Sequence, residues 1–264
     1  MEWPSLLIDT ILFRPYVFVF LGVYLVIAIL NMGVIRTVIF TVLAYTIAFL
    51  SEYSSTRNGF PYGFYSYIET TRDKELWISN VPFMDSLSYS FLSYIAYTMA
   101  LFIWSPLKIN RWDIRLVENA SVKRSLTVIF SGAMFFMLMD VIIDPVAFQG
   151  DRWFLGKIYT YKEQGEYFNI PLTNFAGWLL VGTVILYSFT QLDKWLTRIL
   201  PTNNYELPAQ ALLGPGLYFG VLLFNLVVTF YIGEWALGFC GMGLVFSLMW
   251  LINQKIRNPE NFSI

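Results

Sequence analysis

The chain has 264 residues, of which 57% are hydrophobic and 13% charged, whereas soluble domains are roughly half apolar and a quarter charged. We therefore expect an integral membrane protein with a single membrane-embedded domain over residues 1–264. The net charge of −1 argues against a nucleic-acid partner. One cysteine and no histidine exclude an intrachain disulfide framework and leave acid–base chemistry to Asp, Glu, Tyr or Lys.

Apolar runs of about 20 residues, the length that a bilayer requires, predict the secondary structure. The predicted spans cover residues 16–31, 34–51, 82–104, 124–143, 171–190, 210–231 and 235–252. Helix starts are indicated by Pro15, Pro82 and Pro171, because proline is tolerated in a first turn. The last two spans are joined almost directly, around Gly233. The pattern predicts an all-α polytopic membrane bundle of about seven transmembrane helices.

The loop charges favour one orientation. Ten Lys and Arg residues fall on one face of this topology and seven on the other. The positive-inside rule then predicts a cytoplasmic C-terminus, and the cluster from Lys108 to Arg124 supports it. The N-terminus lacks the basic start and the cleavage site of a signal peptide, so we expect the first helix to be retained.

Asp140 and Asp144 are the most informative residues, because they lie one turn apart at the end of the fourth predicted span. A carboxylate in hydrocarbon costs roughly 2.5–3.5 kcal/mol, so such an acid is a functional-site hypothesis. Residues four apart share a helix face, and both acids can therefore reach one substrate atom or one water. Pro145 is expected to end this helix. The alternative is that the two acids only bond neighbouring helices and hold the bundle together.

Other polar residues are predicted at the same, less basic face. Glu52 ends the second span, Asp85 begins the third, and Asn174 begins the fifth. Asp85 has an alternative role as a helix N-terminal acid. Glu234, between the last two spans, is equally explained as a loop charge. Because these positions converge, we expect a polar site near one membrane face.

Two longer loops, residues 52–81 and 145–170, are rich in Tyr, Gly and charge. Residues 59–63 (Gly-Phe-Pro-Tyr-Gly) predict a tight turn whose glycines supply positive φ. The tyrosines have an alternative explanation as an interfacial aromatic belt. Asn174 and Trp178 lie four apart and share a helix face at the end of the second loop.

Several motifs are absent. The sequence has no phosphate-binding glycine loop, no Ser-His-Asp set, no metal-ligand set and no DDxxD-type aspartates for a prenyl diphosphate. Lys255 is the lysine nearest the last span, and it falls at the end of that span, which argues against a retinal Schiff base.

Together these segments resemble the membrane proteins of carotenoid biosynthesis that include the CruF-type carotenoid 1,2-hydratases and the bisanhydrobacterioruberin hydratases. The resemblance covers most of the chain and is weakest after about Pro201. It rests on Arg14-Pro15-Tyr16, Glu52, Gly59-Phe60-Pro61-Tyr62-Gly63-Phe64-Tyr65, Pro82, Asp140, Asp144-Pro145, Gly150, Trp153, Ile170-Pro171, Asn174-Phe175 and Gly177-Trp178.

The resemblance implies a cofactor-independent hydro-lyase in a prokaryotic cell membrane. Its substrate would be a lycopene-like or bisanhydrobacterioruberin-like carotenoid held in the lipid bilayer. Water would add across the terminal C1,2 double bond of an acyclic ψ-end group. No metal is expected. The sequence specifies neither which carotenoid reacts nor an oligomeric state.

A mechanism follows as a hypothesis. Asp140 would protonate C2 as a neutral acid, a form that a low dielectric favours, and Asp144 would accept the proton of water; Glu52 is the rival for either role. Asn174 would hold the water, and Trp178 would stabilise the cation through its π electrons. The substrate-binding candidates are Asn174, Trp178, Asp85, Tyr62, Tyr65 and Trp153.

Two other functions remain open from the sequence. One is a different acid-catalysed carotenoid or isoprenoid end-group reaction, cyclisation or isomerisation. The other is a non-enzymatic proton-coupled transporter or lipid-binding protein, because acid pairs in bundles also serve as proton relays.

Overall fold

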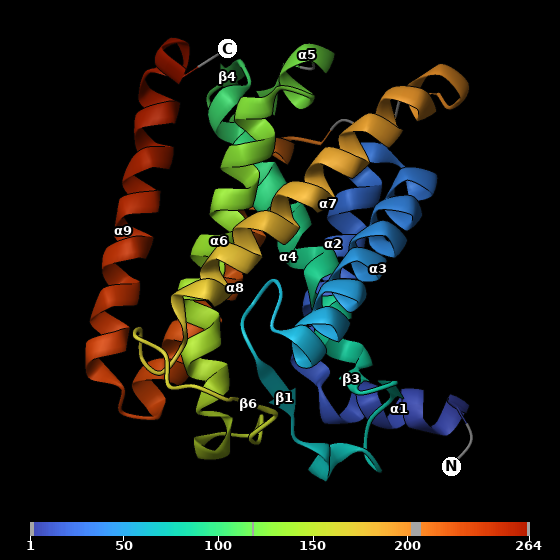
Figure 1. The fold of residues 1–264 in the computed structure, drawn as a ribbon. Coiled ribbons are helices and arrows are strands. Elements are labelled where there is room, and N and C mark those ends of the chain that lie inside the picture. Colours follow the sequence, from blue (N-terminus) through green and yellow to red (C-terminus); the bar gives the residue numbers. More distant parts are fainter. Residues whose placement is uncertain (1–2, 118, 202–206, 263–264) are drawn as a thin grey trace.

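The computed structural model describes residues 3–117, 119–201 and 207–262. In these residues seven helices are long and apolar enough to cross a membrane (Figure 1). They are α2 (Pro15–Met32), α3 (Val34–Asn58), α4 (Phe83–Trp104), α6 (Leu126–Phe148), α7 (Leu172–Ile199), α8 (Leu213–Tyr231) and α9 (Trp235–Arg257). The predicted all-α bundle of seven spans is confirmed, including the short joint at Gly233 between the last two.

Shorter elements cap the two ends of the bundle. Helix α1 (Trp3–Phe13) precedes the first span, and α5 (Ala120–Lys123) precedes α6. The described strands form antiparallel pairs: β1 (Tyr65–Tyr67) with β6 (Tyr159–Tyr161), β2 (Trp77–Ile78) with β3 (Val81–Pro82), and β4 (Leu107–Asn110) with β5 (Asp113–Leu116). The β1–β6 pair joins the two long Tyr-rich loops.

Helix α4 forms the centre of the bundle. It contacts α2, α3, α6 and α8. Within its most apolar stretch of 18 residues, 89% of the residues are buried inside the protein. Buried small residues line it, among them Ser86, Ser90, Ser93, Ala96 and Ala100. Such residues let neighbouring helices approach closely. Helix α4 is also the least apolar of the seven spans, which is tolerated because protein, rather than lipid, surrounds it.

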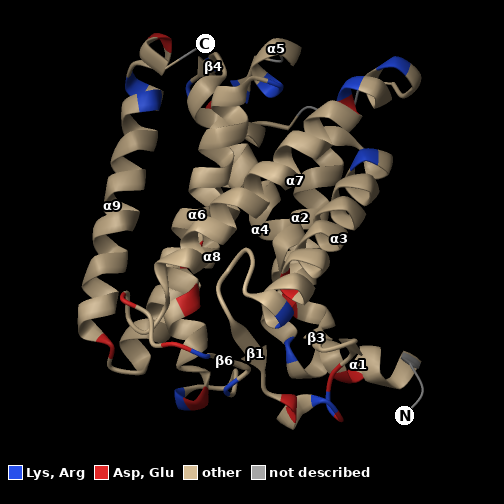
Figure 2. Cartoon of the chain, in the orientation of Figure 1, with Lys and Arg blue, Asp and Glu red and all other residues tan. Residues whose placement is uncertain are grey.

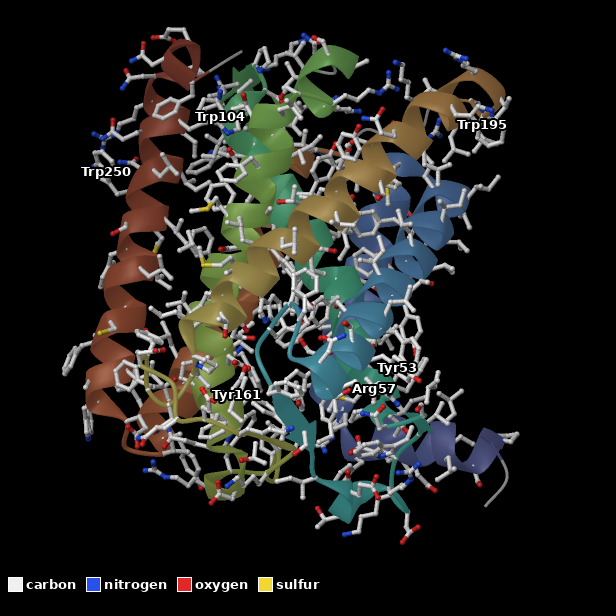
Figure 3. All side chains as sticks on the ribbon, viewed as in Figure 1. Tyr53, Arg57, Trp104, Tyr161, Trp195 and Trp250 are labelled. Atoms are coloured by element: carbon white, nitrogen blue, oxygen red, sulfur yellow. The ribbon has the colours of Figure 1, made fainter. Side chains whose placement is uncertain are left out.

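The membrane-facing surface has the expected distribution of side chains. Charged residues gather at the two ends of the bundle (Figure 2). The exposed Trp195 and Trp250 lie near the end that carries the C-terminus, and Tyr53 lies near the other end (Figure 3). Aromatic side chains at both interfaces are typical of membrane proteins.

Several predicted helix ends are wrong. Helix α7 continues to Ile199, nine residues beyond its predicted end at residue 190, and α9 continues to Arg257, five residues beyond residue 252. Helix α6 continues through Pro145 to Phe148. Proline in a last turn removes only one intrahelical bond, and the end carbonyls find other donors: the Trp153 indole donates to Val146 O at 3.0 Å. Helix α3 extends to Asn58, seven residues beyond its predicted end at residue 51, and Gly59 with φ +82° ends it.

A buried ion pair fastens the loops at the end of the bundle where α3 and α6 end, here called the acidic end. Arg14 Nη2 lies 3.0 Å from Glu75 Oε1 and Arg14 Nε lies 3.1 Å from Glu75 Oε2, with both side chains fully buried. Arg14 also donates to the carbonyl of Leu155. The pair therefore ties the start of α2 to the loops that follow β1 and precede β6.

We expect Glu75→Ala to destabilise the protein by about 3–5 kcal/mol, because it leaves the Arg14 charge buried without its partner. The measurement is the thermal unfolding midpoint of the purified protein in detergent. Glu69→Ala is the matched control, since it breaks an ion pair with Arg72 whose two side chains are largely exposed and should leave the midpoint unchanged. Equal midpoints for the two variants would contradict a stabilising role for Arg14–Glu75.

Candidate functional site

Four carboxyl groups line one cavity at the acidic end. Glu52 comes from α3, Asp85 from α4, and Asp140 and Asp144 from α6. The cavity has a volume of about 110 Å³. Its other lining residues are Tyr62, Tyr65, Tyr67, Ser88, Tyr89, Leu92, Ile143, Ala147, Ile158, Tyr159, Tyr161, Asn174 and Trp178. The convergence expected from the sequence is therefore present.

One amide connects the two aspartates of α6. Asn174 Nδ2 donates to Asp140 Oδ2 at 2.6 Å and to Asp144 Oδ2 at 2.9 Å. Asp140 is fully buried. Its other oxygen, Oδ1, is buried and has no hydrogen-bond partner among the described residues. A carboxyl oxygen in this position suits a neutral acid that carries its proton, because a buried unpaired charge is strongly disfavoured.

Asp144 has a different environment. It is partly exposed and accepts three side-chain hydrogen bonds, from Asn174, from the Tyr159 hydroxyl and from the Tyr161 hydroxyl at 3.1 Å. Hydrogen bonds donated to a carboxylate favour its charged form. The environment of Asp140 is therefore suited to donating a proton, and that of Asp144, one turn away, is suited to accepting one.

Glu52 and Asp85 line the same cavity from helices α3 and α4. Glu52 is buried and accepts from the Tyr67 hydroxyl at 3.2 Å and from the Ser86 hydroxyl. Both of its oxygens are thus occupied, which distinguishes it from Asp140. Asp85 lies in the first turn of α4 and is partly exposed. Since Asp85 lines the cavity, a helix-terminus role alone does not account for its position.

Stacked aromatic rings form an apolar wall. The Trp178 ring lies 4.6 Å from the Tyr89 ring at an interplanar angle of 20°, and 4.5 Å from the Phe136 ring. Tyr62 lies within the predicted glycine turn at residues 59–63, in which Gly59 and Gly63 both have positive φ. A face of π electrons beside carboxyl groups is suited to a transient carbocation.

The turn at residues 59–63 packs directly on helix α7. A Cβ atom at Gly177 would lie 2.5 Å from the Tyr62 ring and 2.8 Å from the Pro61 carbonyl oxygen. Contacts under about 3 Å are not tolerated by real Cβ atoms, so only glycine permits this approach. Gly177, next to Trp178, therefore sets how closely Tyr62 approaches the cavity wall.

Tyr89 of α4, which lines the cavity, is missing from the sequence-based candidates, and so are three tyrosines of the loops, Tyr67, Tyr159 and Tyr161. The three loop tyrosines belong to strands β1 and β6, whose residues pair as Tyr65 with Tyr161 and Tyr67 with Tyr159. Figure 3 places Tyr161 at the acidic end. Burial raises the pKa of each of the four tyrosines of these strands well above its usual value, so their hydroxyls remain protonated donors. The sequence feature that could identify these loop residues is a Tyr-x-Tyr pattern, which occurs in both loops.

Two other residues singled out in the sequence lie elsewhere. Trp153 does not line the cavity; its ring packs near Tyr16, Phe154 and Phe224, and its indole N–H caps helix α6. Glu234 forms an ion pair with Arg152, which agrees with the loop-charge interpretation.

Comparison with known proteins identifies the family to which the chain belongs. A family described as "Carotenoid biosynthesis protein" matches residues 13–248. The chain is also 28% identical over 195 residues to the bisanhydrobacterioruberin hydratase of Haloarcula japonica. That match covers 70% of this chain and 57% of the relative, so the similarity spans little more than half of the relative's length. No solved structure matches the chain. Because the family match covers most of the sequence, the chain belongs to the carotenoid biosynthesis protein family.

Proposed function

We propose that this protein is a carotenoid hydratase that adds water to the terminal C1,2 double bond of an acyclic ψ-end group. The observation that carries the proposal is the unequal environment of the two aspartates. Asp140 has a buried oxygen with no partner among the residues that the structure describes, whereas Asp144 accepts three side-chain hydrogen bonds. The relative's name describes a hydratase, and the chain's single membrane-embedded domain contains the acids that such a reaction needs.

In the proposed reaction Asp140 gives its proton to C2 of the alkene, and the electron pair of the double bond forms the new C–H bond. The tertiary cation left at C1 is captured by water, and Asp144 takes the proton that this water releases. The product is a tertiary alcohol. Proton exchange with water in the cavity then restores both carboxyl groups, so no organic cofactor or metal is consumed.

The surrounding residues have supporting roles. Trp178, stacked on Tyr89 and packed at a tilt against Phe136, stabilises the cation by about 2 kcal/mol when water is excluded. Asn174 holds both aspartates and orients the attacking water. Glu52, whose oxygens are both occupied, is a weaker candidate for the proton donor than Asp140. Asp85, Tyr62 and Tyr65 complete the wall that contacts the end group.

The substrate enters from the membrane. A polyene lies in the hydrocarbon with one end group inserted between helices, and water arrives from the face at the acidic end. The loop charges favour a cytoplasmic C-terminus in a prokaryotic cell membrane, which puts the acidic end on the outer side.

Other functions fit the observations less closely. Cyclisation or isomerisation would use the same acid and aromatic wall but would not need a carboxylate held by three donors. A proton-coupled transporter needs ionisable groups along a path across the membrane, whereas Glu52, Asp85, Asp140 and Asp144 gather around one cavity at the acidic end.

Expression in a bacterial host that makes lycopene should yield a new, more polar pigment that is heavier by one water. The measurement is chromatography with mass spectrometry of the extracted pigments. Host cells carrying the empty vector are the control. A new isomer of unchanged mass would instead support cyclisation or isomerisation, and unchanged pigments with well-inserted protein would count against a lycopene hydratase.

Asp140→Asn should lower the hydration rate by at least about 100-fold, because it removes the proton donor while keeping the shape of the side chain. The rate is measured on purified enzyme with a ψ-ended carotenoid in detergent. Asp151→Asn is the matched control, since Asp151 is exposed and does not line the cavity; its rate should equal that of the unchanged protein. Full activity of Asp140→Asn would show that another group donates the proton.

A further inference from the structure

The two Tyr-x-Tyr segments meet to form one aromatic surface. Residues two apart on a strand project to the same face, and β1 pairs with β6 in a register that sets Tyr65 opposite Tyr161 and Tyr67 opposite Tyr159. The Tyr65 ring lies 6.0 Å from the Tyr159 ring and 5.9 Å from the Tyr161 ring, and Tyr159 lies 5.7 Å from Tyr161. All four line the cavity. We call this pair of strands the tyrosine ribbon.

The hydroxyl groups of the tyrosine ribbon contact carboxyl groups from two helices, Asp144 of α6 and Glu52 of α3. Tyr159 and Tyr161 donate to the two oxygens of Asp144. Tyr67 donates to Glu52, and the Tyr65 hydroxyl lies 3.5 Å from that of Tyr67. Phe148, in the last turn of α6, packs against Tyr159 and Tyr161 with ring centroids 5.8 and 6.1 Å apart. The two donors to Asp144 are therefore held in place by both the strand pairing and the end of α6.

A tertiary cation next to Asp140 has two fates. Water adds to C1 if a base is positioned to accept the water's proton. Otherwise the cation loses a proton from C2 or from a methyl group back to the Asp140 carboxylate, which regenerates an alkene. The second fate needs Asp140 alone, whereas the first also needs an ionised and oriented Asp144.

We propose that Tyr159 and Tyr161 are positioning residues that, by holding the Asp144 carboxylate, direct the cation to water capture instead of proton loss. This inference rests on the proposed hydratase function and deepens it. It assigns the choice of reaction product to the tyrosine ribbon, which lies in the loops, and not to the proton donor on the helix.

The test measures, in D₂O, how the cation divides between the alcohol and the returned alkene in the double variant Tyr159→Phe/Tyr161→Phe. In D₂O Asp140 delivers a deuteron to C2, and return of the original proton from C2 to Asp140 leaves deuterium in the recovered alkene. Mass spectrometry then gives both products, the alcohol and the deuterated alkene. We expect alcohol formation to fall about tenfold or more, while alkene deuteration is kept within about twofold, so that the ratio of exchange to hydration rises.

Tyr218→Phe is the control for a merely structural effect. Tyr218 is fully buried and donates to Phe135 O at 2.8 Å, and it does not line the cavity. Loss of the Tyr218 hydroxyl should lower the amount of folded enzyme but leave the ratio of exchange to hydration unchanged. Equal losses of exchange and hydration in the double variant, or no loss of either, would overturn the role of the tyrosine ribbon while the hydratase function stood. If the unchanged protein formed neither the alcohol nor the deuterated alkene, the proposed function would be overturned, and this inference with it.

Discussion

A carboxyl group beside hydrocarbon has to be neutral or surrounded by hydrogen-bond donors, and four such groups meet at one end of this bundle. The donors come from separate parts of the chain: Asn174 from α7, Ser86 from α4 and the tyrosine ribbon from the loops. Helix α4 can carry polar side chains because other helices cover it. The central position of α4 and the close contacts around it are thus conditions for keeping these acids within the membrane.

The acidic end also depends on how its loops are fastened. Arg14 bonds Glu75, in the loop between β1 and β2, and the carbonyl of Leu155, shortly before β6. Both strands of the tyrosine ribbon are therefore anchored by one buried ion pair outside the cavity. On the helix side, Gly177 lets the turn at residues 59–63 lie directly against α7. Loops that would otherwise be free at a membrane surface are held to the bundle at two points.

Much of this arrangement can be predicted from the sequence because it is local. The seven spans follow from hydrophobic length, the Asp140–Asp144 spacing from helix geometry, and the turn at residues 59–63 from its glycines. The tyrosine ribbon could not be predicted in this way. Its strands have three residues each and are far apart in the chain, so only the tertiary pairing distinguishes Tyr159 and Tyr161 from an interfacial belt. The helix end at Pro145 was missed because proline breaks helix interiors more strongly than last turns.

The depth of the two aspartates in the membrane does not by itself explain why they differ. Asn174 bonds both of them, and both line the same cavity, so the shared amide cannot distinguish acid from base. The two aspartates differ in burial, since Asp140 is fully buried and Asp144 partly exposed, and in the two tyrosine hydroxyls that contact Asp144 alone. In the proposed mechanism, helix α6 sets the spacing of the two acids, and the loop tyrosines determine which of them acts as the base. Under the proposed hydratase mechanism, a chain with the same aspartates but without these hydroxyls would keep its proton donor and lose its oriented base. That change would convert hydration of the alkene into its isomerisation.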